Sequence, residues 1–122
     1  MLTKQTPETI RARLTVKAQG VENDLVLTYF NHTPAEFKEW AENPENLKVP
    51  DGIDPLKQID LALAHVNAAV VLYLVKSFDD GTDKAFPLTR DGLIDLEQTW
   101  PDTLAGIIRG YHKARGASVE KN

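Results

Sequence analysis

The sequence predicts one α+β domain in which an N-terminal antiparallel β-hairpin packs on a bundle of about four helices. Its 122 residues are the length of a single ordinary domain, which places residues 1–122 in one folding unit. Apolar residues make up 42% and charged residues 26% of the chain, close to the averages of globular proteins. The apolar residues recur at every second position before residue 31 and at every third or fourth position after residue 33, which indicates strands followed by helices.

The hairpin is predicted by strict alternation over residues 10–19. Apolar residues occupy the even positions and polar residues the odd ones, as in a strand with one face in water. Gly20–Asp24 supply turn residues, and Leu25–Phe30 form a second β-rich run. The residues of the apolar face are Ile10, Ala12, Leu14, Val16 and Ala18.

A first helix is predicted to begin after Thr33, which can cap free amide groups while Pro34 fits the first turn. Glu36 completes a capping box with Thr33. Asn43-Pro44 ends the helix, because proline disfavours helical geometry in the residue before it. The apolar stripe of this helix is Phe37, Trp40 and Ala41. Residues 44–54 follow as a loop long enough to wrap a partner.

A second, central helix is predicted to begin at Asp54-Pro55 and to run to Val75. Its expected buried face recurs at three- and four-residue steps: Leu56, Ile59, Leu63, Val66, Val70 and Leu74. A buried strand over 70–75 is the competing interpretation, because the β-branched residues and Tyr73 favour it. We favour the helix, since no turn signal separates Leu61 from Val75.

The last third of the chain predicts a turn and two further helices. Asp79–Asp83 is the turn, and a short helix introduced by Pro87-Leu88-Thr89 closes at Trp100. A final helix over 101–115 places Leu104, Ile107, Ile108 and Tyr111 on one side and stops at Gly116. Residues 1–8 and 117–122 are expected to be flexible.

Composition excludes several classes of protein. The chain has no cysteine, so disulfides and sulfur metal ligands are absent. A net charge of −4 argues against general binding to nucleic acid or to anionic membranes. The longest apolar run, Ala68–Val75, is too short to span a membrane. The first residues have no apolar segment of a secretory signal, so we expect a cytoplasmic protein.

No motif predicts catalysis, a cofactor or a metal. Asp79, Asp80 and Asp83 do not fit a calcium loop, because glycine stands at the third position and Arg90 at the twelfth. The three histidines, at 32, 65 and 112, lack the four-residue helical spacing of a zinc site. No glycine-rich phosphate loop or paired acid–base carboxylates stand out. An interaction protein is therefore favoured over an enzyme.

Two stretches resemble the tail assembly chaperones of long-tailed phages and prophages. In residues 25–37, a strand leads into the Tyr29-Phe30-Asn31-His32-Thr33-Pro34 helix start typical of that family. In residues 75–111, Val75 and Phe78-Asp79 precede a Pro-Leu-Thr helix start with Gly92-Leu93, and then Trp100-Pro101, Ile107 and Tyr111. The closing Lys121-Asn122 is also similar to the family's usual ending.

The resemblance implies a non-enzymatic role in the cytoplasm of the bacterial host. Such chaperones bind the long, helix-rich tape measure protein while the tail tube assembles around it. In many of these systems a frameshifted longer form recruits the major tail protein. Self-association is left open by the charge pattern, which is +3 over 1–20, −4 over 36–60 and +2 over 101–122.

We place the partner-binding surface on the last helix. Gly106 and Gly110 form a small-residue step that predicts close approach of another helix. The proposed contact residues are Leu104, Ile108 and Tyr111, with a basic rim of Arg109, Lys113 and Arg115. The alternative function is a small acidic regulatory or immunity-type module whose region 36–60 docks a basic protein.

Overall fold

The computed structural model describes residues 1–116, and the predicted flexible end at 117–122 lies outside the described residues. Three strands and five α-helices confirm the predicted α+β class. In chain order the elements are β1 (Thr9–Ala18), β2 (Val21–Phe30), α1 (Pro34–Glu42), a 3-10 turn η1 (Pro44–Leu47), α2 (Ile59–Leu74), β3 (Val75–Phe78), α3 (Thr82–Ala85), α4 (Arg90–Thr99) and α5 (Thr103–Arg115). Residues 1–8 form no helix or strand up to the start of β1, and all are exposed.

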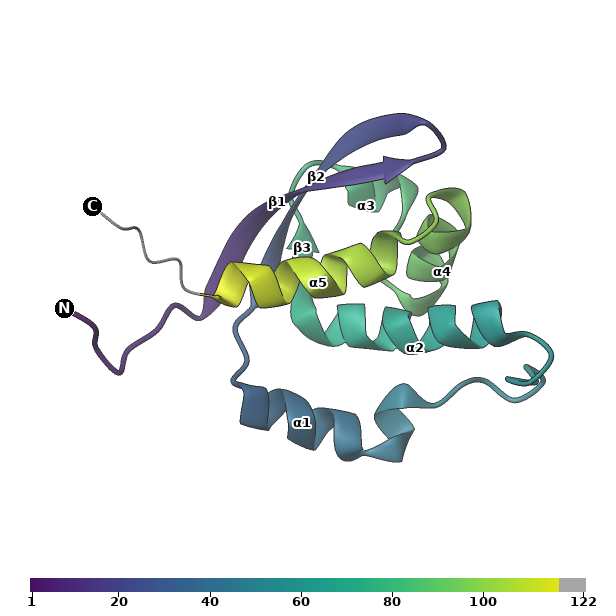
Figure 1. The fold of residues 1–122 in the computed structure, drawn as a ribbon, viewed down its shortest axis with the longest axis horizontal. Helices are drawn as coiled ribbons and strands as arrows, with labels where there is room; N and C mark the ends of the chain where they lie inside the picture. Colours follow the sequence, from purple (N-terminus) through teal and green to yellow (C-terminus); the bar gives the residue numbers. More distant parts are fainter. Residues whose placement is uncertain (117–122) are drawn as a thin grey trace.

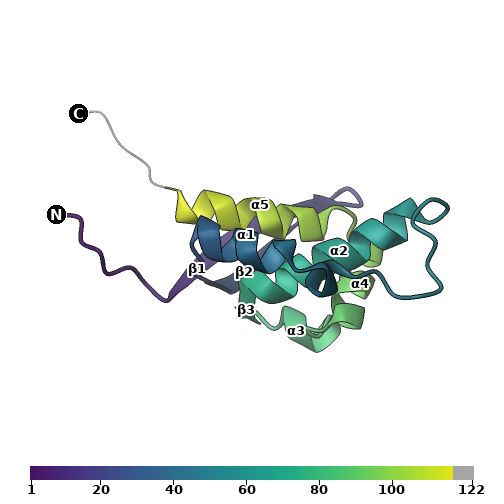
Figure 2. The same ribbon diagram turned by 90° about the horizontal axis from the view of Figure 1, so that it is seen from below.

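The elements form three layers (Figure 1). The sheet covers one side, α2, α4 and α5 form the middle, and α1 lies outside them, as the turned view also shows (Figure 2). The core fills the space between the sheet and the middle helices. Its fully buried large side chains are Leu27, Tyr29, Val71, Leu74, Val75, Leu93, Leu104, Ile107 and Tyr111.

The hairpin is confirmed, but its turn is tighter than predicted. Ala18 pairs directly with Val21, so the turn consists of Gln19 and Gly20 alone. Both have positive φ, 55° and 73°, as a two-residue type I′ turn requires. The predicted turn residues 21–24 instead extend β2, because they pair with β1 and their acids meet its basic side chains.

A third strand, β3, completes an antiparallel sheet with the order β1-β2-β3. Leu27 pairs with Phe78 and Tyr29 with Val75, with an irregularity between Thr28 and Tyr29. Residues 70–74 are helical, and the chain becomes extended at Val75. The helical interpretation of this segment therefore holds as far as Leu74, whereas the strand that follows was not predicted.

The predicted start of the central helix is wrong. The Asp54 side chain accepts a hydrogen bond from the Leu56 amide at 2.9 Å, and the Asp54 carbonyl accepts one from the Gln58 amide at 2.8 Å. These bonds close a separate turn over residues 54–58, because the aspartate caps the turn itself rather than a helix. Helix α2 begins only at Ile59.

The start of α1 is confirmed in detail. Thr33 Oγ1 accepts a hydrogen bond from the Glu36 amide, and a Glu36 carboxylate oxygen accepts one from the Thr33 amide, which is the predicted capping box. The hydrogen bonds from Thr33, backbone first, lower the pKa of Glu36. None of the residues of α1 is fully buried. This helix is thus well defined locally but packs lightly on the rest of the molecule.

Candidate interaction surface

The six residues predicted for partner binding divide into two groups on α5. Leu104 and Tyr111 are fully buried, and Ile108 is half-buried. Arg109, Lys113 and Arg115 are exposed. Leu104 and Tyr111 belong to the core, because the face of α5 that carries them packs against the sheet and α2. The basic rim of the predicted surface is exposed, and of its apolar residues only Ile108 is partly accessible.

Tyr111 fastens α5 to the segment between β2 and α1. Its hydroxyl donates to the His32 carbonyl at 2.8 Å and accepts from the His32 amide at 3.1 Å. One turn further on, Arg115 Nε donates to Asn31 Oδ1 at 2.8 Å. The Tyr111 ring also meets Tyr29 edge-on, with 5.5 Å between the ring centroids. Tyr111 therefore has a structural role in holding the two segments together.

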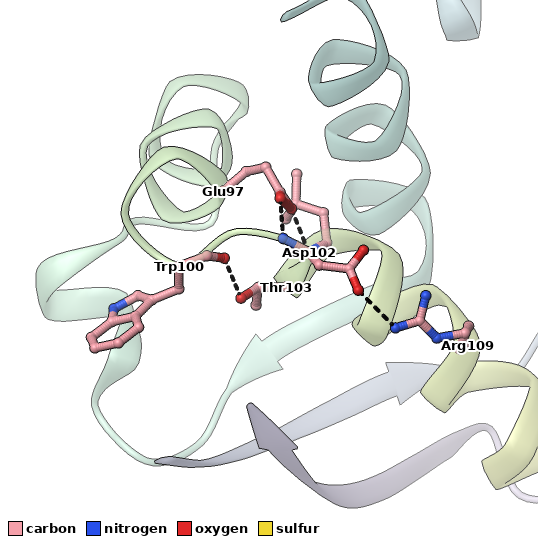
Figure 3. Close-up of polar contacts among 6 residues, drawn as sticks. Glu97, Trp100, Asp102, Thr103 and Arg109 are labelled. Carbon is pink, nitrogen blue, oxygen red and sulfur yellow. Dashed lines mark hydrogen bonds and ion pairs between the residues drawn. The ribbon is translucent and has the colours of Figure 1, made fainter. Parts of the chain in front are cut away.

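The start of α5 is held by α4 (Figure 3). Glu97 accepts hydrogen bonds from the amides of Asp102 and Leu104, so a carboxylate satisfies free amides at the positive end of the helix dipole. Thr103 Oγ1 donates to the Trp100 carbonyl at 2.6 Å (Figure 3). Arg109 forms an exposed ion pair with Asp102 at 3.3 Å. Of the predicted rim, Arg109 is thus already engaged within the chain.

The small-residue step of α5 meets a strand rather than the predicted helix. A Cβ atom on Gly110 would lie 2.7 Å from Leu14 Cδ2 in β1 and 2.8 Å from the Tyr29 hydroxyl in β2. Gly106 has only the Arg109 side chain within 4 Å, at 3.7 Å, and lines a groove of about 360 Å³ between β1 and α5. Gly110 thus allows α5 to pack closely against Leu14 and Tyr29 of the sheet.

An aromatic stack attaches α1 to α2. The Tyr73 ring of α2 lies between two parallel rings, Trp40 at a centroid distance of 4.4 Å and His32 at 4.0 Å. Phe37 meets Tyr73 edge-on at 5.9 Å and lies 6.4 Å from the Tyr111 ring. Ring contacts of this kind add about 0.5–1.5 kcal/mol each beyond the area that they bury. Trp40 is therefore a packing residue between layers, although it is only half-buried.

The largest exposed apolar side chains of the helices gather before and within the first half of α2. Leu56 is 94% exposed, Ile59 69% and Leu63 55%, and we call these three residues the α2 patch. Helical periodicity predicts that these three residues are buried, and that prediction is wrong. The buried face of α2 carries smaller residues instead: Ala62, Ala64, Ala68, Ala69, Val71 and Leu74.

The alanines of α2 explain why the face that carries them, and not the face of the α2 patch, is buried. They allow α2 to come close to α4, α5 and the sheet, all of which it contacts. Both faces of α2 are apolar, so a search for apolar periodicity alone does not distinguish them. The signal that sequence reasoning missed is the row of alanines, since small side chains mark the place where two elements approach most closely.

Acidic residues flank the residues of the α2 patch in the sequence. Asp51 and Asp54 precede Leu56, Asp60 follows Ile59, and all three carboxylates are on exposed residues. Lys57 is a basic residue within the same stretch. Over residues 36–60, seven carboxylates and three lysines give a net charge of −4. The segment that contains the patch thus combines exposed apolar side chains with a net negative charge.

Two aspartates singled out in the sequence have structural roles at the end of β3. Asp79 accepts a hydrogen bond from Thr28 Oγ1 at 2.6 Å, which lowers its pKa. Asp80 accepts from the Val26 amide at 2.9 Å and from Thr82 Oγ1 at 2.6 Å. Burial tends to raise the pKa of Asp80, but these hydrogen bonds outweigh it and the pKa falls. Both carboxylates hold β3 and the following turn to β2.

His65 lies where α2 meets α4. Its carbonyl accepts a hydrogen bond from Arg90 Nη1 at 3.1 Å, whereas its buried Nδ1 has no hydrogen-bond partner among residues 1–116. Burial, and then the charge of Arg90, lower the pKa of His65. The neutral imidazole is therefore the form that this helix contact favours.

Residues 1–116 contain neither a cluster suited to a metal ion nor a helix suited to crossing a membrane. In this part of the chain no three His, Asp or Glu side chains come together in a way that could hold a metal ion. None of the helices over the same residues has the length and apolar character needed to cross a membrane. Comparisons with protein-family models, curated proteins and solved structures find no significant match to this chain.

Proposed function

We propose that this chain is a tail assembly chaperone of a long-tailed phage or prophage. In this proposal it acts without catalysis in the bacterial cytoplasm, where it binds the tape measure protein and keeps it soluble while the tail tube assembles. The family resemblance of residues 25–37 and 75–111 motivates the proposal. The structural observation that carries it is the α2 patch, whose three side chains are more than half exposed.

An exposed apolar patch on a folded domain is characteristic of a protein-binding surface. A tape measure protein cannot bury all its apolar surface before the tube forms around it. Many copies of a small acidic domain, each with one apolar patch, would cover such a protein by repeated weak contacts. A longer frameshifted form that recruits the major tail protein belongs to the same proposal.

Co-expression tests this function directly. The chain is produced together with the tape measure protein encoded in the same phage or prophage, and the soluble tape measure fraction is measured after centrifugation. We expect the wild-type chain to raise that fraction several-fold over an empty vector, and the two proteins to elute together. If the tape measure protein remains insoluble, or is equally soluble alone, the proposal is wrong.

The order of neighbouring genes provides an independent test. A gene for a major tail protein upstream and a gene for a very long helical protein downstream would support the proposal. Tyr111→Ala is a poor variant for the binding assay, because Tyr111 is buried and joins α5 to His32. Variants of the α2 patch are the appropriate ones.

The second candidate is a small acidic regulatory or immunity-type module that docks a basic protein. The exposed carboxylates of region 36–60 favour it. A complex with a basic protein that lacks long helices, and that dissociates fully in 0.5 M salt, would favour this candidate over the chaperone.

A further inference from the structure

The outward face of α2 is one continuous apolar stripe. Ile59, Leu63, Val66, Val70 and Tyr73 follow one another at three- and four-residue steps, which places them on one side of a helix. Exposure decreases along the stripe, from 69% at Ile59 and 55% at Leu63 to half-buried for the last three. The stripe is thus exposed at its start, the bare half, and half-buried toward its end.

The Tyr73 end of the stripe is packed against a helix of the same chain. Trp40 and Phe37 of α1 lie against Tyr73, and η1 contacts α2 as well. In both views α1 lies alongside α2 on its outer side (Figures 1 and 2). The molecule therefore shows, at the Tyr73 end of this stripe, that an amphipathic helix is a suitable occupant. Ile59 and Leu63 lie on the same face of α2, toward the start of the helix.

The charges around the bare half determine what kind of helix fits. Asp51, Asp54 and Asp60 are exposed and close to it in the sequence, with Lys57 as the one basic residue among them, and the wider segment 36–60 has a net charge of −4. A second copy docked through the same face would bring two such acidic segments together, which costs free energy. A helix with basic residues beside its apolar stripe meets opposite charges instead.

We infer that the α2 patch is the docking site for one amphipathic, basic helix of a partner protein, which lies along Ile59 and Leu63, on the same face of α2 that α1 contacts at Tyr73. The inference rests on the proposed function for the identity of the partner, whose helices would come from the tape measure protein. The class of occupant follows from the stripe and from its charged surroundings.

A pair of synthetic peptides tests the inference. One is an 18-residue helix with leucine on one face and lysine on the other, and its twin has glutamate in place of lysine. Binding of each labelled peptide to the wild-type chain is measured by fluorescence anisotropy. We expect the basic peptide to bind at least tenfold more tightly than the acidic one at low salt.

Variants of the chain locate the site. Ile59→Gln with Leu63→Gln keeps good helix formers at exposed positions, so the fold is expected to remain intact by circular dichroism. We expect this double variant to bind the basic peptide at least tenfold more weakly. The matched control is Val21→Gln, which removes another exposed apolar side chain, 49% exposed, and should change binding less than twofold.

A charge variant separates attraction from apolar contact. Asp51→Asn with Asp60→Asn should weaken binding of the basic peptide several-fold at 50 mM salt. The same change should not affect binding at 500 mM salt, because salt screens exposed charges. The matched control is Asp83→Asn on α3. Equal binding of the basic peptide by wild type and by the Ile59/Leu63 double variant would overturn the inference, as would equal binding of the two peptides.

The tape measure co-expression assay, repeated with the double variant, distinguishes the two proposals. If wild type and variant solubilise the tape measure protein equally, the chaperone function stands and the docking site is wrong. If the peptides bind through the α2 patch but the wild type does not solubilise the tape measure protein, the docking site stands and the partner is wrong. A wild-type dimer in sedimentation that the double variant converts to monomer would overturn the inference in favour of a second copy.

Discussion

Replacing Gly92 by alanine puts a methyl group where the backbone of the preceding segment already lies. A Cβ atom at Gly92 would be 2.0 Å from the Pro87 carbonyl oxygen and 2.9 Å from the Pro87 carbonyl carbon and nitrogen. The neighbouring chain cannot simply move away, because Thr89 Oγ1 accepts a hydrogen bond from the Gly92 amide and caps α4. Relief therefore requires a backbone shift at the start of the helix.

The expected cost combines opposing contributions. Overpacking of this kind costs about 1–3 kcal/mol, and a weakened cap about 1 kcal/mol more. Alanine in a helix returns roughly 0.5–1 kcal/mol relative to glycine. We therefore expect Gly92→Ala to lower the free energy of unfolding by about 1–3.5 kcal/mol, which corresponds to a decrease in Tm of roughly 5–15 °C.

Gly106→Ala is the matched control, since it makes the same chemical change in a helix with open space. Its nearest neighbour would be Arg109 Nη2, at 3.7 Å, so alanine should raise stability by about 0.5–1 kcal/mol. The stability of Gly110→Ala should lie between those of Gly106→Ala and Gly92→Ala. Its added methyl group would contact the flexible Leu14 side chain and the hydrogen-bonded Tyr29 hydroxyl.

Urea unfolding followed by tryptophan fluorescence measures the three variants and the wild type under identical conditions. The expected order of stability is Gly106→Ala, wild type, Gly110→Ala, Gly92→Ala. A Gly92→Ala protein as stable as the wild type, or a loss of equal size at Gly106 and Gly92, would refute the packing argument.

Three further predictions concern the titratable and aromatic groups. The pKa of Asp80 is lowered in the folded state, so its stabilisation is present above the ordinary value of 3.8 and is lost as pH falls through the folded value. When unfolding is measured at decreasing pH, the free energy of unfolding should therefore fall less for Asp80→Asn than for wild type. The pKa of His65 is also lowered, so the unfolded state gains a proton first and stability decreases as pH falls below 6.5. His65→Leu should reduce the difference in urea midpoint between pH 7.5 and 5.5, and an unchanged difference would contradict this assignment. Trp40→Ala removes a ring stacked on Tyr73, so hydrogen exchange should accelerate in α1 while the amides of α5 remain protected.

Local signals made the hairpin and the first helix predictable. The alternation of residues 10–18 and the capping residues Thr33 and Glu36 act within a few positions of one another, and the structure contains both features. The start of α2 was misplaced because Asp54 can cap a turn as well as a helix. β3 was missed because Val75–Phe78 become a strand only through pairing with β2, which lies some fifty residues earlier.

The candidate surface was less predictable than the fold. Leu104 and Tyr111 were placed on a binding face by helical periodicity, yet periodicity alone does not reveal whether an apolar face meets the core or solvent. The same ambiguity hid the α2 patch. The face of α2 that is buried depends on how closely its alanines allow α4 and α5 to approach, and that is a property of the assembled structure.

The position of the end of α5 has a practical consequence for assays of the α2 patch. Helix α5 finishes at Arg115 near the start of β1, whereas the beginning of α2 lies at the opposite end of the molecule (Figure 1). A tag or a surface linker joined directly behind Arg115 would therefore be attached at the far end from the α2 patch. The chain could in this way be immobilised with the α2 patch left accessible to a probe.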